Sequence, residues 1–315
     1  MGVILITGIA GGLARQTAFK LRDQGHQVVG VDYRTPFRSL PDDIKVYRAN
    51  YNKTIIEDIF KAHPFDTVLH LGRVGNLKVE SGKRFDLNVV GTQKIMNLCV
   101  SRGVRRLVVL STFHIYGAHP KNHTPISEDD PLSAGFKFPQ IADAIQLDNL
   151  ASQWVYRHPE VCTSVLRATN IIGPDINNTM STFLRKPRVP YVLGFDPMMQ
   201  FIHQDDLSDA IVAAISREQC GIFNVAGDEA VPWRTALHLA GAQAYPLPAV
   251  MALAYHLIQP QFPRHLVDYF KYPCIIDTRR FKKTFDWTSS VDLQTALQST
   301  VAQAREEQLN AEGLG

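Results

Sequence analysis

The chain has 315 residues, 45% of them hydrophobic, and a formal net charge of +3 at pH 7. This size allows one large or two coupled globular domains, and the small net charge does not indicate a nucleic-acid-binding protein. Since no apolar run reaches the roughly 20 residues that span a bilayer, we expect no membrane segment. Because the chain starts directly in an apolar strand, we expect no signal peptide. The scattered cysteines predict buried free thiols in a reducing cytoplasm: Cys99, Cys162, Cys220 and Cys274.

The first predicted strand, over residues 3–7, runs into a glycine-rich turn and then a helix over 15–24. Gly8 permits a tight turn, Gly11 lets the backbone approach a phosphate, and the small Ala14 lets the helix pack close to the strand. The N–H groups and the dipole at the start of such a helix favour an anion. We therefore expect the turn to bind the pyrophosphate of a dinucleotide through Gly8, Ile9, Ala10, Gly11, Gly12 and Leu13.

Asp32 ends the second predicted strand, over 27–31, near the spacing of about 20 residues that is typical of the acid that binds a ribose 2′-hydroxyl. A carboxylate there accepts hydrogen bonds from the ribose diol and repels a 2′-phosphate, which favours NAD over NADP. Arg34 and Arg38 follow closely and could favour NADP, although both could also be solvated loop residues. We expect NAD as the cofactor.

Strands and helices then alternate. We expect strands over 45–48, 67–71, 106–110 and 163–167, and helices over 55–62, 85–102 and 141–157. This alternation predicts an α/β fold, a Rossmann-like doubly wound parallel sheet with ligand loops at the carboxyl ends of the strands.

The alternation breaks after residue 171. Proline-rich loops lead to a helix that opens at Asp205, a strand over 222–225 and an apolar helical stretch over 247–270 that Pro260 and Pro263 interrupt. We expect an NAD-binding domain over 1–171 and a small α/β substrate lobe over 172–315, the two partly interleaved. Residues 251–258 could form a dimer or membrane-surface face, but a helix packed on its own lobe is favoured.

Further motifs occur in order along nearly the whole chain: Thr7-Gly8-x-x-Gly11-x-x-Ala14, His70-Leu71-Gly72-Arg73, Leu87-Asn88-Val89-Val90-Gly91-Thr92, Ser111-Thr112-Phe113-His114-Ile115-Tyr116-Gly117, Leu166-Arg167-Ala168-Thr169-Asn170-Ile171-Ile172-Gly173-Pro174, Phe201-Ile202-His203-Gln204-Asp205-Asp206, Phe223-Asn224-Val225-Ala226-Gly227 and Phe285-Asp286-Trp287. Together they resemble the extended short-chain dehydrogenase/reductase family, in its NAD-dependent sugar epimerase/dehydratase group typified by UDP-glucose 4-epimerase. The resemblance implies NAD, a small-molecule substrate that could be a nucleotide sugar, and a homodimer.

The resemblance also implies site residues. Beyond the glycine turn, those near the cofactor are Asp32, Tyr33, Arg34, Asn50, Tyr51, Leu71, Gly72, Arg73, Asn88, Ser111, Gln140, Ala144 and Thr169. Arg73 is a bulky departure from the family pattern and could contact the pyrophosphate or the substrate. On the substrate side we expect Asn170, Arg185 and Arg188, since the guanidinium fork suits a phosphate; the two arginines could also be a plain surface cluster.

The catalytic pair of the family, a tyrosine and a lysine four residues later, is missing. Counting back from Asp148, where the family has an acid, places Gln140 and Ala144 at these positions, and neither can exchange a proton. Thr112 resembles the family serine or threonine that hydrogen-bonds the reacting hydroxyl. Other acid/base candidates are Asp143, His114 and Lys137, and an aspartate would need a pKa raised by burial.

Three hypotheses follow from this vacancy. The protein could be an NAD-dependent epimerase/dehydratase-like enzyme with non-standard acid/base residues, or an inactive NAD(H)-binding sensor or scaffold. It could also keep only the fold, which the intact glycine turn and Asp32 disfavour. His119 and His123 have the HxxxH spacing but lie in a predicted loop, so we expect no metal site.

Overall fold

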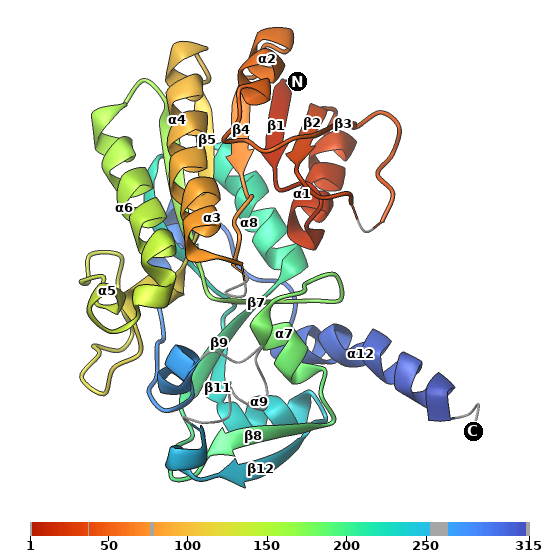
Figure 1. The fold of residues 1–315 in the computed structure, drawn as a ribbon, viewed down its shortest axis with the longest axis vertical. Helices are drawn as coiled ribbons and strands as arrows, with labels where there is room; N and C mark the ends of the chain where they lie inside the picture. The colour runs from red at the N-terminus through yellow and green to blue at the C-terminus, as the bar shows by residue number, and fades with distance from the viewer. Residues whose placement is uncertain (1, 37, 76–78, 253–263, 313–315) are drawn as a thin grey trace.

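The computed structural model describes residues 2–36, 38–75, 79–252 and 264–312. Its main feature is a seven-stranded sheet with the order β10-β6-β5-β4-β1-β2-β3, in which every pairing is parallel (Figure 1). The strands are β1 (Val3–Thr7), β2 (Gln27–Asp32), β3 (Lys45–Arg48), β4 (Thr67–His70), β5 (Arg106–Thr112), β6 (Cys162–Ala168) and β10 (Gly221–Val225). The prediction of a doubly wound parallel sheet is confirmed.

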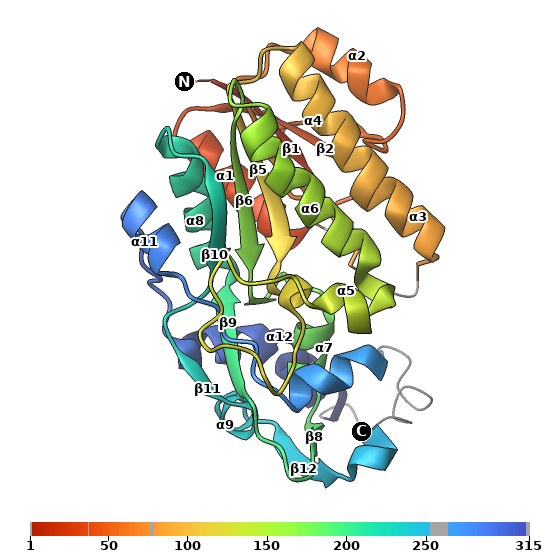
Figure 2. The ribbon, with the colours of Figure 1, turned by 90° about the vertical axis from the view of Figure 1, so that its left-hand side faces the viewer.

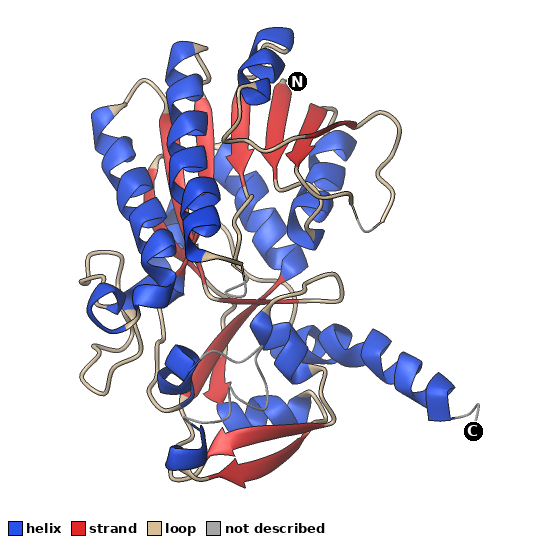
Figure 3. Ribbon diagram, in the orientation of Figure 1, coloured by secondary structure: helices blue, strands red, loops and turns tan. Residues whose placement is uncertain are grey.

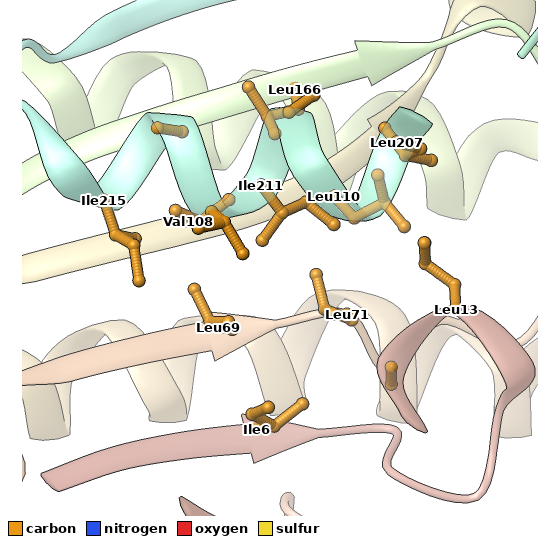
Figure 4. Close-up of a cluster of buried hydrophobic side chains, with 14 of the residues drawn as sticks. Ile6, Leu13, Leu69, Leu71, Val108, Leu110, Leu166, Leu207, Ile211 and Ile215 are labelled. Atoms are coloured by element: carbon orange, nitrogen blue, oxygen red, sulfur yellow. The ribbon is translucent and has the colours of Figure 1, made fainter. Parts of the chain in front are cut away.

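Helices cover both faces of this sheet (Figure 2). One face carries α1 (Gly12–Asp23), α8 (Gln204–Ser216) and α11 (Arg279–Phe285), and the other carries α2 (Ile55–Ala62), α4 (Gly91–Ser101) and α6 (Ala142–Arg157). Since the central strands are buried from both sides, they are apolar almost throughout, as parallel sheets require. Figure 4 shows the first of these cores, where Leu69 and Val108 of the sheet face Ile211 of α8.

A smaller lobe lies beyond the carboxyl ends of the strands (Figure 3). It contains a three-stranded and a two-stranded sheet and its own apolar core. Its elements are β7 (Asn170–Ile172), α7 (Thr179–Leu184), β8 (Arg188–Val192), β9 (Met198–His203), β11 (Ala230–Pro232), α9 (Trp233–Leu239), β12 (Gln243–Leu247), a 3-10 helix (Arg264–Phe270) and α12 (Leu293–Glu312). The chain returns to the large sheet with α8, β10 and α11, so the two lobes are interleaved.

The helix expected over 85–102 is a composite. It consists of α3 (Ser81–Phe85), a π-helical turn η1 (Asp86–Val90) and α4. Single π-turns within helices are frequent at functional sites, and this one contains Asn88. Short 3-10 and α segments also follow β5 and precede α6: η2 (Phe113–Tyr116), α5 (Ala134–Lys137) and η3 (Pro139–Ile141).

Two other expectations need correction. The interrupted helical stretch expected over 247–270 begins in a strand, because Leu247 ends β12, and its last segment, from Arg264, is a 3-10 helix. Most of 251–258 lies outside the described residues. The thiols are free, but Cys220, which precedes the edge strand β10, is exposed, and Cys162, the first residue of β6, is only partly buried. Among the described residues, no helix is long and apolar enough to cross a membrane and no histidine, cysteine or acidic cluster suits a metal ion.

Candidate functional site

The glycine turn between β1 and α1 is built by close backbone contacts. Gly8 has a φ of +78°, and a Cβ at this position would lie 2.6 Å from the Cα of Gly72. Glycine adopts positive φ at no steric cost, so both requirements select it here. Gly12 has no room for a side chain either, since a Cβ would overlap the backbone of Asp175. The turn is therefore packed against the loops that follow β4 and β7.

The turn leaves the start of α1 open to a ligand. No described side chain caps α1, and its first turn contains no acidic residue. Unpaired N–H groups at a helix N-terminus attract a phosphate. The backbone N–H of Ala10 instead donates to Asp32 Oδ2 at 3.1 Å, which ties the turn to the end of β2. Asp32 is almost fully buried.

Asn50 and Tyr51 follow β3 beside the end of β2. The Oδ1 atom of Asn50 is buried and has no hydrogen-bond partner among the described residues. The exocyclic amino group of an adenine is a donor that this atom would suit, so the residues fit a dinucleotide. Tyr51 is 2% exposed and its hydroxyl donates to the Gly72 carbonyl at 3.0 Å. The Tyr51 side chain thus fixes the position of the loop after β4 through Gly72.

A buried hydrogen-bond relay connects that loop to the π-turn. Gly72 N–H donates to Thr7 Oγ1 at 3.2 Å, and the Thr7 hydroxyl lies 2.8 Å from His70 Nδ1. On the other side of the ring, His70 Nε2 lies 2.8 Å from Thr92 Oγ1, which donates to the Asn88 carbonyl at 2.6 Å. Burial lowers the pKa of His70 to about 4, so the ring is neutral at pH 7 and serves as a structural link.

Thr112 and His114 form a polar pair at the carboxyl end of β5. Thr112 Oγ1 lies 2.8 Å from His114 Nδ1. The His114 ring contacts Phe113 at a centroid distance of 4.2 Å and Tyr269 at 4.9 Å. The Tyr269 hydroxyl donates to the His114 carbonyl at 2.6 Å, and burial raises the pKa of this phenol well above its usual value. The imidazole is therefore held in place from the smaller lobe.

Asp143 lies in a buried network between α6, α3 and η1. Its Oδ2 accepts a hydrogen bond from Asn88 Nδ2 at 2.6 Å, and its Oδ1 pairs with the Arg84 guanidinium at 3.4 Å. Arg84 also donates to the Gln140 carbonyl at 2.6 Å. The nearby Asp143 charge partly offsets the burial that lowers the pKa of Arg73. Two arginines and an asparagine thus surround the one carboxylate beside position 144.

Positions 140 and 144 themselves carry no acid or base. Gln140 is exposed and precedes α6, whereas Ala144 is 4% exposed on the inner face of this helix. One turn later, Asp148 binds the Arg167 guanidinium at 2.7 Å and accepts from the Ser111 hydroxyl at 2.5 Å. The Ser111 side chain is therefore turned toward α6.

The expected substrate residues Asn170, Arg185 and Arg188 each bind other parts of the protein, and Asn170 shares its partner with Thr169, which was expected near the cofactor. Thr169 and Asn170 both donate to the Gln200 carbonyl, at 3.1 and 2.9 Å. Arg185 donates to the carbonyls of Gly173, Pro174, Ile176 and Thr300 and to Asn177 Oδ1, so a phosphate would have to displace these acceptors. Arg188 is exposed on β8 and donates to Gln243 Oε1 at 3.1 Å.

Sequence reasoning missed Arg84, Tyr269 and Asp175. Arg84 follows Lys83 in a short helix, a pattern typical of a solvated surface, and only the packing of α3 on α6 buries it. Tyr269 lies in a stretch that was interpreted as apolar helix. Asp175 pairs with Arg15 at 2.7 Å and with Arg38 at 3.2 Å, and no local pattern signals these contacts. The side chain of the candidate Lys137 lies outside the described part of the chain.

Comparison with known proteins agrees with this geometry. Residues 4–226 match the model of the NAD dependent epimerase/dehydratase family. The chain is 26% identical to an uncharacterized protein of Mycobacterium tuberculosis over 89% of this chain and 78% of that protein. It is 23% identical to a UDP-glucuronate 4-epimerase of Thermodesulfobacterium geofontis over 97% of both chains. Its fold is similar to that of a UDP-glucose 4-epimerase of Thermotoga maritima solved with UDP-glucose, with a TM-score of 0.78 and 20% identity over 97% of this chain and 99% of that one.

The cofactor expected from the glycine turn and Asp32 is the one that the family description names. The matched region includes the turn, Asp32, Thr112 and α6, and the fold similarity extends over the smaller lobe. The chain therefore belongs to the NAD dependent epimerase/dehydratase family.

Proposed function

We propose that this protein is a cytoplasmic, homodimeric enzyme of the epimerase/dehydratase type that acts on a nucleotide sugar, with the Thr112–His114 pair as its acid/base group. The observation that carries the proposal is the 2.8 Å contact between Thr112 Oγ1 and His114 Nδ1 at the carboxyl end of β5. In doubly wound sheets, ligands bind at this edge. The similarity to UDP-glucuronate and UDP-glucose 4-epimerases along nearly the whole chain supports the substrate class.

The cofactor would be held by the start of α1, by Asp32 and by Asn50, whose Oδ1 has no other described partner. When bound, NAD would accept a hydride from the sugar carbon that bears a hydroxyl group. The proton of that hydroxyl must leave at the same time, and this part of the chemistry belongs to the protein.

Thr112 can bridge the substrate to a base. With the imidazole proton on Nε2, His114 Nδ1 accepts the Thr112 hydroxyl hydrogen, and Thr112 Oγ1 can in turn accept the proton of a sugar hydroxyl. Histidine is the common proton acceptor near neutral pH. Tyr269 holds the His114 backbone at 2.6 Å, which keeps the ring oriented. Such a positioned base contributes roughly 10²–10⁴ in rate.

We favour His114 over Asp143 as the base. Both Asp143 oxygens are already engaged, one by Asn88 at 2.6 Å and the other by Arg84 at 3.4 Å. Proton transfer to this carboxylate would break a buried network, which is costly. Asp143 is better suited to hold α6 against the π-turn.

A second candidate function is an inactive NAD(H)-binding sensor. It is favoured by Ala144, which is buried at the position where the resemblance to the family implies a lysine, and by the exposed Gln140. In this case the binding of NAD(H) would change the conformation of the smaller lobe, and no substrate would be converted.

A nucleotide-sugar screen of the purified protein, followed by NMR of the products, tests the two proposals. We expect Thr112→Val and His114→Gln each to reduce turnover by roughly 10²–10⁴, whereas the exposed His123→Gln control keeps it. Unchanged turnover in both variants would overturn the assignment of the pair. If no sugar is converted, limited proteolysis with and without NADH decides: protection of the lobe after Ile172 supports the sensor, and identical digestion contradicts it.

A further inference from the structure

Asp32 is fully engaged by hydrogen bonds. Its Oδ1 accepts from Arg34 N–H at 2.9 Å and from Arg34 Nε at 3.2 Å. Its Oδ2 accepts from Ala10 N–H at 3.1 Å and from the terminal Arg34 nitrogen at 3.1 Å. A carboxylate has about four acceptor positions, so the ribose diol of a dinucleotide can reach Asp32 only if the Arg34 side chain leaves.

The Arg34 side chain can leave at little cost. It is 53% exposed, whereas Asp32 is 2% exposed, and the guanidinium carbon also lies 5.6 Å from the Tyr33 ring. Two ribose hydroxyls would replace the two side-chain hydrogen bonds one for one. The two backbone donors would keep Asp32 in place.

A second arginine borders the same region. Arg38 is 49% exposed and pairs with Asp175, which also binds Arg15. Three arginines and two carboxylates therefore leave this part of the site with one net positive charge. Asp32 alone would repel a 2′-phosphate, but the exposed arginine directly beside it offers that phosphate a bidentate partner.

We propose that Arg34 allows the nucleotide site to accept NADP as well as NAD, by moving from Asp32 onto the 2′-phosphate. This inference rests on the nucleotide site of the proposed function. For NAD the side chain is a competitor that must be displaced, and for NADP it is a ligand. Arg34 is then the residue that sets the ratio of the two affinities.

Calorimetric titration of the full-length protein with NAD⁺ and NADP⁺ tests the proposal. For the wild type we expect dissociation constants within about tenfold of each other, with a steeper salt dependence for NADP⁺. Arg34→Ala should weaken NADP⁺ by about tenfold or more and leave NAD⁺ equal or tighter. Asp32→Asn should shift the ratio the other way, and Arg34→Lys should retain part of the NADP⁺ affinity.

The control is Arg102→Ala, which removes one exposed positive charge between α4 and β5, at the amino ends of the strands. Titration with 5′-AMP and adenosine 2′,5′-bisphosphate isolates the 2′-phosphate from the nicotinamide half. Two results overturn the role of Arg34 but leave the nucleotide site intact. One is NAD⁺ binding to the wild type more than about 10³-fold tighter than NADP⁺. The other is an equal loss of affinity for both dinucleotides in Arg34→Ala. Absence of binding by either dinucleotide contradicts the nucleotide site itself.

Discussion

The buried ion pair between Asp148 and Arg167 gives the sharpest stability prediction. Asp148 is fully buried and Arg167 is 3% exposed. Asp148 accepts two hydrogen bonds from the guanidinium, at 2.7 and 3.1 Å, and others from Ser111 and Ser152. Replacing it with alanine leaves the Arg167 charge buried without its carboxylate. We expect Asp148→Ala to reduce the free energy of unfolding by about 3–5 kcal/mol.

Urea denaturation followed by circular dichroism measures this loss. The matched control is Glu218→Ala, which removes a carboxylate that is 85% exposed and 3.4 Å from Arg106. Such surface pairs contribute about 0–1 kcal/mol. A double variant, Asp148→Leu with Arg167→Met, removes both charges and should recover much of the loss.

A loss below about 1 kcal/mol for Asp148→Ala would refute this reasoning. It would mean that water or a rearrangement of α6 neutralises the stranded guanidinium. Since α6 also carries Asp143 and Ala144, that result would weaken our placement of the whole helix against β5 and β6.

Three further predictions follow from the site. The pKa of His70 is about 4 in the folded chain against 6.5 normally, so the unfolded state binds more protons between these two pH values. The free energy of unfolding should therefore fall by about 3 kcal/mol as the pH falls from 6.5 to 4. If the wild type loses less stability over this range than His70→Gln does, the reasoning is contradicted. Gly8→Ala should abolish NAD binding, because the new Cβ would overlap Gly72. The control Gly103→Ala, at a φ of +67° with open space around it, should keep NAD binding and cost only about 1–2 kcal/mol in the free energy of unfolding. Equal NAD affinity in the two variants would be inconsistent with the close packing of Gly8 on Gly72. Tyr269→Phe should lower the free energy of unfolding by about 1 kcal/mol in thermal or urea denaturation. It should also reduce turnover by a larger factor than it raises Km. A change in Km alone would argue against a role of Tyr269 in orienting His114.

Local patterns were sufficient to predict the parallel sheet with its flanking helices and the class of cofactor. The glycine turn, Asp32 and the β/α alternation depend on neighbours in sequence, because turn geometry and strand burial are set within a few residues. The π-turn was not predicted, since its helical period is continuous with α3 and α4 on either side. Asn50 was identified from its motif position, and its buried, unpartnered Oδ1 emerged only from the structure.

The sequence by itself determined the family, the parallel sheet and the cofactor class, and it predicted that the tyrosine–lysine pair is lost. Only the tertiary structure decided what surrounds positions 140 and 144. Arg84 reaches Asp143 across 59 residues, and Tyr269 reaches His114 across 155. Contacts over such separations arise from the packing of whole helices and lobes, and no local pattern of residues specifies them. For this reason the sequence predicted which residues occupy the two positions, and only the fold shows which charged and polar groups lie near them.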